Sequence, residues 1–143
     1  MEKLFDAKLE CLDDVIDFLT ENVKDTPAEE HLMELRIVVE ELYVNIAMYA
    51  YQHKDDIPDS ERTVLISIES DKSGLVKMRF EDSGYPFDPL AKKDPNMAEY
   101  IKTRSVGGLG IMIVKKKMDN LEYKYENGKN ILSMDKKYNT EVQ

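Results

Sequence analysis

The longest helical pattern in this chain runs from about Ala28 to Tyr51. Its apolar residues recur at three- and four-residue spacing and form one broad face, made of Leu32, Leu35, Val38, Val39, Leu42, Ile46 and Ala50. Thr26 is a good N-cap and Pro27 a good first helical residue, so the start of the helix is marked as well. We therefore expect this segment to be the central helix of the fold.

The other elements are shorter. Leu12 to Val23 has the same apolar spacing and predicts a second helix, and a third follows Gly110 and ends near Asp119. Strand patterns occur at 3–9, 64–68, 75–80, 121–125 and 130–134, with hairpin turns at 71–74 and 126–129. The stretch 82–105 reads as a long loop with one short helix near 97–101. This order predicts an α+β fold, with helices on one face of a mostly antiparallel sheet.

Composition narrows the class of protein. At 143 residues the chain is long enough for one domain, 1–143, with a real core. Its formal charge of -9 argues against nucleic acid and anionic membranes as direct partners. The single cysteine, Cys11, can form no intramolecular disulfide. No secretory signal or membrane-spanning run is visible, so we expect a cytoplasmic protein.

Three groups of residues carry candidate chemistry. Glu41 and Asn45 are four apart on the central helix and share a face, where a carboxylate and a carboxamide oxygen suit magnesium. Asp82 ends a predicted strand, so its carboxylate can accept a hydrogen bond from an exocyclic amine, and Gly84 lets a flat ring approach the backbone. These two groups also have ordinary interpretations. Glu41 and Asn45 can be a solvated helix face, and the segment from Asp82 can be a tight turn.

The third group is a glycine-rich turn before a helix, from Arg104 to Gly110. Glycines let amide groups converge, and a helix N-terminus offers unpaired N–H groups and partial positive charge to a phosphate. The pattern matches neither the dinucleotide-binding fingerprint nor the Walker motif. A glycine-rich turn without ligand remains the alternative at this point.

Taken in order, these groups and the closing segment 130–134 resemble the GHKL ATPase superfamily, which has the Bergerat fold. The resemblance is closest to bacterial anti-sigma-factor serine/threonine kinases. Segments typical of that subgroup are 38–41, 86–89, 107–111 and 118–123. The resemblance spans essentially the whole chain and implies a two-layer α/β sandwich, with a mixed, mostly antiparallel sheet and about three helices on one face.

The resemblance also implies roles for individual residues. Glu41 would orient or deprotonate the attacking hydroxyl, and Asn45 would bind Mg²⁺. Asp82 would accept the adenine amine, with Gly84 making room for the base and Ser133 assisting through a water. The other ATP-binding residues implied are Pro86, Phe87, Lys102, Arg104, Ser105, Gly107, Gly108, Leu109 and Gly110. Residues 88–106 would form a lid over ATP, in which Lys102 and Arg104 are the cations expected to reach the terminal phosphate.

The chain departs from the family pattern after Asn45. The family commonly has a small residue and a histidine where this chain has Ile46 and Tyr49, which leaves the Glu41 and Asn45 chemistry intact. The resemblance implies a protein serine kinase in transcription regulation, which phosphorylates an antagonist protein, sequesters a sigma factor and forms a homodimer. The alternative is a nucleotide-gated binding regulator that transfers no phosphate. A histidine kinase fragment is disfavoured. Its phosphoacceptor histidine would lie on a dimerisation helix before the ATP domain, and neither His31 nor His53 has that position.

Overall fold

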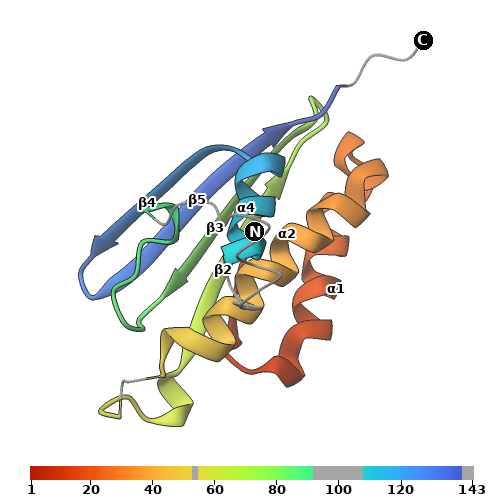
Figure 1. Ribbon diagram of the computed structural model, residues 1–143. Helices are drawn as coiled ribbons and strands as arrows, with labels where there is room; N and C mark the ends of the chain where they lie inside the picture. The colour runs from red at the N-terminus through yellow and green to blue at the C-terminus, as the bar shows by residue number, and fades with distance from the viewer. Residues whose placement is uncertain (53–54, 92–107, 140–143) are drawn as a thin grey trace.

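The computed structural model describes residues 1–52, 55–91 and 108–139. A five-stranded sheet runs through it in the order β1-β2-β3-β5-β4 (Figure 1). Its strands are β1 (Glu2–Asp6), β2 (Thr63–Ser70), β3 (Leu75–Asp82), β4 (Asp119–Glu126) and β5 (Lys129–Lys137). Each pair of neighbours in this sheet is antiparallel, so it is simpler than the mixed sheet expected.

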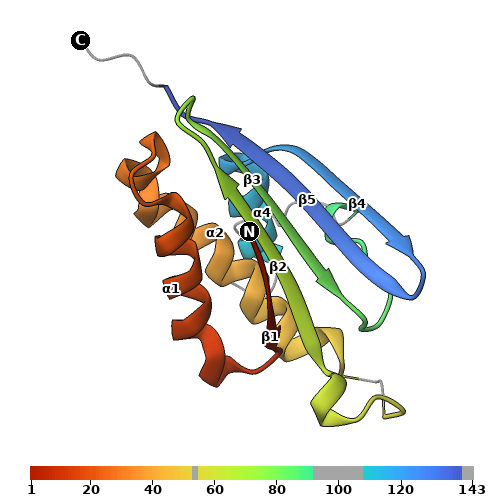
Figure 2. The same ribbon diagram turned by 180° about the vertical axis from the view of Figure 1, so that it is seen from behind.

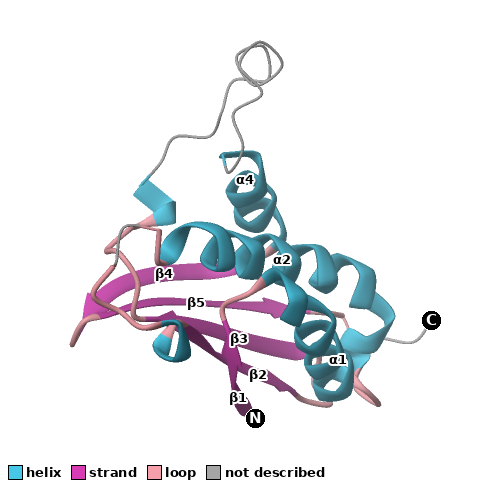
Figure 3. Ribbon diagram, turned by 90° about the horizontal axis from the view of Figure 1, so that it is seen from below, coloured by secondary structure: helices cyan, strands magenta, loops and turns pink. Residues whose placement is uncertain are grey.

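Three α-helices in the described ranges cover one face of the sheet, as Figure 3 shows. They are α1 (Leu12–Val23), α2 (Leu32–Asn45) and α4 (Gly108–Lys117), with short 3₁₀ turns η1 (Leu9–Cys11), η2 (Pro27–His31), η4 (Asp59–Glu61) and η5 (Pro89–Ala91). Helix α2 packs against both α1 and α4. Seen from behind, the strands pass in front of α4, and α1 stands at one side (Figure 2). The α+β two-layer sandwich and its central helix are therefore confirmed.

The segment predicted as one long helix has three parts. The 3₁₀ turn η2 leads into α2, and a π-helical turn, η3 (Ile46–Ala50), follows. Thr26 has the extended backbone of an N-cap and Pro27 takes the first helical position, as predicted. The Thr26 side chain makes no cap hydrogen bond to the helix, and its hydroxyl bonds instead to the Val23 carbonyl and to Ser70. Asn45 lies at the junction of the α and π turns, a type of irregularity that is frequent at functional sites.

The core lies between the sheet and the helices. Alternate residues of β2 and β3 are buried toward the helices, namely Val64, Ile66, Ile68, Val76, Met78 and Phe80. Of the faces predicted from apolar spacing, the helices bury Val15, Leu19 and Val23 from α1, and Leu35, Val38, Val39 and Leu42 from α2. Phe18 and Tyr43 are buried as well, although the spacing did not include them. Each such side chain contributes about 1.5–3 kcal/mol on burial. This packing fixes α2 over the middle of the sheet.

Two local features bear on the site. The hairpin between β4 and β5 turns at Asn127 and Gly128, whose φ angles of 54° and 76° are those of a type I′ turn. Helix α4 begins at Gly108, three residues before the predicted Ile111, so Gly108, Leu109 and Gly110 form its first turn.

The short helix expected at 97–101 lies outside the described residues. In the parts of the chain that are described, every helix is too short or too polar to cross a bilayer.

Candidate functional site

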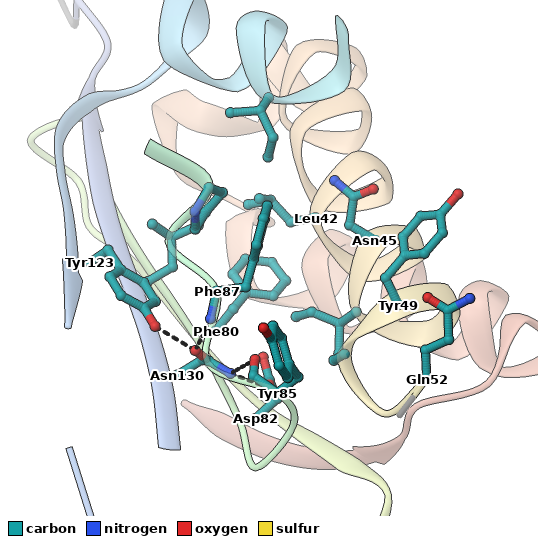
Figure 4. Close-up of a pocket in the computed structure, with 15 residues that line it drawn as sticks. Leu42, Asn45, Tyr49, Gln52, Phe80, Asp82, Tyr85, Phe87, Tyr123 and Asn130 are labelled. Carbon is teal, nitrogen blue, oxygen red and sulfur yellow. Dashed lines mark hydrogen bonds between the residues drawn. The ribbon is translucent and has the colours of Figure 1, made fainter. Parts of the chain in front are cut away.

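A cavity of about 340 Å³ opens between the sheet and the end of α2, at the point where β3 ends (Figure 4). Its size is within the range of small-molecule sites. The walls are mostly apolar and aromatic, and residues that line it include Leu42, Asn45, Ile46, Tyr49, Phe80, Asp82, Tyr85, Phe87, Ile111, Tyr123, Asn130 and Leu132. The cavity therefore combines apolar surface with a few polar groups, which suits a flat ring bearing an amine.

Asp82 is the buried carboxylate of this cavity. Its Oδ1 accepts hydrogen bonds from the Gly84 N–H at 2.9 Å and from Asn130 Nδ2 at 3.0 Å. Among the described residues, none donates to its second oxygen, Oδ2. Burial raises the pKa of Asp82, while the bonds from Asn130 and Gly84 act in the opposite direction. Asp82 thus has one oxygen held by the protein and one left to accept a bond from a ligand.

Asn130 is a site residue that the sequence prediction missed, and Ser133 was the wrong choice. In the register of β3 and β5, Asn130 stands opposite Asp82, whereas Ser133 stands opposite Arg79. Side chains alternate along a strand, so residues three apart point to opposite faces. Ser133 accordingly lies on the face without helices, between Arg79 of β3 and Glu122 of β4. A signal was present in the sequence, since Asn130 shares its face with the apolar Leu132 and Met134.

The structure shows a packing reason for glycine at position 84. A Cβ at this position would collide with the backbone of Ala50 in η3, and the neighbouring Tyr85 N–H donates to the Ala50 carbonyl at 2.6 Å. The glycine therefore lets the loop after β3 pack directly on the π turn. Tyr51 strengthens the same junction, because its hydroxyl accepts the Ser83 N–H at 3.0 Å and the Thr63 N–H at 3.2 Å.

Glu41 and Asn45 lie one turn apart near the end of α2, which packs against α4. Asn45 lines the cavity directly (Figure 4). The Glu41 carboxylate lies against Gly110 in the first turn of α4. The first four N–H groups of a helix lack partners within it, and this end carries partial positive charge. The fold thus gathers a carboxylate, a carboxamide and a helix N-terminus beside the pocket that contains Asp82.

The remaining predicted residues divide into two groups. Phe87 lines the cavity, whereas Pro86 is exposed beside it. Four predicted residues, Lys102, Arg104, Ser105 and Gly107, lie outside the described residues, as does most of the predicted lid.

Comparison with known proteins identifies the family. Residues 5–136 match the model of the histidine kinase-like ATPase domain. The chain belongs to that family. This finding confirms the GHKL resemblance that the motif order predicted.

Individual relatives of this histidine kinase-like ATPase domain are more distant. The chain is 29% identical over 107 residues to the serine-protein kinase RsbW of Listeria monocytogenes serotype 4a (strain HCC23). It is 28% identical over the same length to the RsbW of Listeria innocua serovar 6a. The matches cover 72% of this chain and 64% of each relative.

A solved structure has the same fold. A chain in the crystal structure of the SiaB-SiaC complex from Pseudomonas aeruginosa superposes with a TM-score of 0.58 at 15% sequence identity. The match covers 94% of this chain and 88% of that one. At this identity the likeness concerns the fold, and it supports the two-layer arrangement described above.

Proposed function

We propose that this protein is an ATP-dependent serine/threonine protein kinase of the anti-sigma-factor type, which phosphorylates a serine of an antagonist protein and sequesters a sigma factor. The observation that carries the proposal is the position of Glu41 and Asn45 between the Asp82 cavity and the N-terminus of α4. Membership of an ATPase domain family and similarity to serine-protein kinases support it.

The nucleotide base would occupy the aromatic cavity. Asp82 Oδ2 would accept a hydrogen bond from the exocyclic amine of adenine, and the flat ring would lie among Phe87, Tyr85 and Leu132. This arrangement leaves the sugar and phosphates directed toward Asn45 and the first turn of α4. The N–H groups at the start of a helix suit phosphate oxygens.

The donor set beside the cavity fits Mg²⁺ held together with a nucleotide. Among the residues that the structure describes, no group of three or more His, Cys, Asp or Glu side chains could hold a metal by itself. Magnesium usually keeps several waters and takes one or two protein ligands plus substrate phosphates, so the single amide oxygen of Asn45 suffices. Bound there, the ion would neutralise charge on the phosphates.

Glu41 would act on the incoming serine. Its carboxylate stands at the start of α4, where the terminal phosphate would bind, and would accept the proton of the attacking hydroxyl or orient it. Positioning and charge neutralisation dominate phosphoryl transfer, so the main task of the protein is to hold hydroxyl and phosphate in line. Lys102 and Arg104 are proposed to add positive charge.

The partners are part of the proposal. The relatives are named as serine-protein kinases, and the structural neighbour was solved in a complex with a second protein. We extend this to an antagonist carrying the acceptor serine, a sigma factor, a homodimeric state and a cytoplasmic location.

The test uses the full chain with labelled ATP, Mg²⁺ and a candidate antagonist domain. We expect phosphoserine on the antagonist, and Glu41→Gln should lower its rate of formation about 10²- to 10⁴-fold while ATP still binds. Glu40→Gln is the matched control, because Glu40 is the adjacent carboxylate and pairs with Arg36 at 3.6 Å. An unchanged rate in Glu41→Gln contradicts the assignment. Tight ATP binding without transfer to any partner would instead favour the nucleotide-gated binding regulator.

A further inference from the structure

We propose that Asn130 is the positioning residue for base recognition: it turns Asp82 so that one carboxylate oxygen faces the ligand, and it ties the loop after β3 to the sheet. This inference deepens the proposed function and rests on it for the identity of the ligand. It concerns a residue of the closing segment 130–134 to which the sequence assigned no role, and its support is a set of hydrogen bonds that converge on one side chain.

The Asn130 carboxamide makes four hydrogen bonds of 3.1 Å or less to three parts of the chain, and a fifth, longer one of 3.5 Å from Nδ2 to the Gly84 carbonyl (Figure 4). Its Nδ2 donates to Asp82 Oδ1 at 3.0 Å and to the Tyr85 carbonyl at 2.9 Å. Its Oδ1 accepts the Phe87 N–H at 3.1 Å and the Tyr123 hydroxyl at 2.5 Å. An amide has two N–H groups and two acceptor sites, so these bonds use its full capacity. Asn130 therefore acts through its neighbours rather than by bonding a ligand.

The partners also determine which way the amide points. The Tyr85 carbonyl can only accept and the Phe87 N–H can only donate, so the nitrogen of Asn130 must face Tyr85 and Asp82. The reversed amide would set two acceptors against each other at Tyr85 and two donors at Phe87. The position of the donor beside Asp82 is thus set by the loop and by β4, through Tyr123.

This donor favours the ionised form of Asp82. Burial raises the pKa of Asp82, and the bond from Asn130 is the largest influence that lowers it. Asn130 and the Gly84 N–H both donate to Oδ1, which leaves Oδ2 directed away from them as the free acceptor. Without Asn130, the carboxyl group would protonate at higher pH and would be held by one donor instead of two. A protonated or rotated Asp82 is a poor acceptor for an amine.

The loop bonds give Asn130 a second effect. Tyr85 and Phe87 line the cavity and belong to the segment that leads from β3 toward η5. Asn130 binds the backbone of both residues, much as a neighbouring strand would, and so holds the aromatic wall against β5. One side chain thereby sets the orientation of the polar group and the position of the apolar wall.

The experiment compares Asn130→Ala and Asn130→Asp in the full chain. The first readout is the pKa of the Asp82 carboxyl by NMR without nucleotide, and we expect it to rise in both variants. The second is affinity for Mg-ATP as a function of pH. We expect affinity at neutral pH to fall about tenfold to a hundredfold and the midpoint of its loss on acidification to move to higher pH. Ser133→Ala, on the opposite face of the same strand, should leave both readouts at wild-type values.

The outcomes are separable. Asn130→Asp conserves volume, so it remains informative if Asn130→Ala does not fold. An unchanged Asp82 pKa in a folded variant overturns the positioning role, as does unchanged affinity with an unshifted pH midpoint. If wild-type protein binds no ATP, the proposed function fails, and the NMR titration still decides whether Asn130 controls Asp82.

Discussion

The carboxylate of Glu41 on α2 lies directly against Gly110 on α4, two residues brought together from positions 69 apart in the chain. A Cβ at Gly110 would stand 3.0 Å from the carboxyl carbon of Glu41 and nearer still to Oε2. The glycine therefore provides the space that the carboxylate occupies beside the N-terminus of α4. The atom in the way is the end of a flexible side chain, so added volume would move Glu41 rather than the helices.

We predict that Gly110→Ala lowers phosphotransfer much more than it lowers stability. Alanine favours a helix over glycine by about 0.5–1 kcal/mol, which offsets the cost of displacing Glu41. The transfer rate should fall at least about tenfold, because displacement of the proposed base disturbs the alignment of the hydroxyl. Rates are measured with saturating ATP, and stability by urea denaturation. In the Glu41→Gln background the same glycine substitution should have little further effect on the rate, and full additivity of the two losses would count against this explanation.

Gly84→Ala should have the opposite profile. The added methyl would meet the carbonyl and Cβ of Ala50, which are backbone and near-backbone atoms that cannot turn away. We expect a loss of about 1–3 kcal/mol in the free energy of unfolding, measured by urea denaturation. Ser83→Ala is the control, since only the backbone of Ser83 bonds to Tyr51, and it should change stability by less than about 0.5 kcal/mol. Equal stability of both variants would show that the loop can move away from η3.

Asp82→Asn should separate binding from stability. An amide places a donor where the ligand amine needs an acceptor, so affinity for ATP should fall about a hundredfold or more. Stability should stay the same or rise, because burial raises the pKa of Asp82 and the charged form is disfavoured in the fold. Calorimetry measures the affinity, and thermal unfolding measures the stability.

The sign of the pH dependence follows from the same shift. A carboxyl whose pKa is raised on folding adds stability as pH falls through that raised pKa, and this gain should be present in wild type and absent in Asp82→Asn.

The control for the affinity measurement is Glu81→Gln, at the adjacent half-exposed residue, which should bind ATP as wild type does. Loss of affinity in Glu81→Gln equal to that in Asp82→Asn would indicate a general charge effect.

A second pH effect is predicted at the other end of α2. Tyr138 donates a hydrogen bond to Glu34 at 2.6 Å, and Lys117 lies 3.3 Å from the same carboxylate. Together they hold the pKa of Glu34 below its ordinary value of 4.5, with the tyrosine bond the largest cause. A depressed carboxyl pKa contributes stability that is present above 4.5 and is lost as pH falls through the folded pKa.

Tyr138→Phe keeps the ring that stacks on His31 and removes only the hydroxyl. We expect the variant to be about 1 kcal/mol less stable at neutral pH and to lose less stability than wild type on acidification below pH 4.5. Urea denaturation at several pH values measures both effects. Parallel pH profiles for the two proteins would exclude Glu34 as the titrating group. Tyr125→Phe, at an exposed position on β4, is the control.

Local patterns were sufficient for much of the fold. The apolar spacing from Leu12 to Val23 predicts α1 with the bounds that the structure has, and the Asn-Gly pair predicts the β4–β5 turn. These features depend on residues a few positions apart, whose periodicity and backbone preferences act within one element. The order of the motifs was likewise enough to predict the ATPase domain family.

Contacts between elements decided the rest. Asn130 faces Asp82 because β3 and β5 pair in one register, and a strand pattern alone does not state which residue stands opposite which. Gly84 and Gly110 have no space for a side chain because η3 and α2 pass against them, which glycine-rich sequence alone cannot indicate. The sequence thus determined most of the elements, since those depend on short-range periodicity, and the order of its motifs resembled the family. Tertiary packing decided which side chains share the cavity, because register and helix placement bring together residues far apart in the chain.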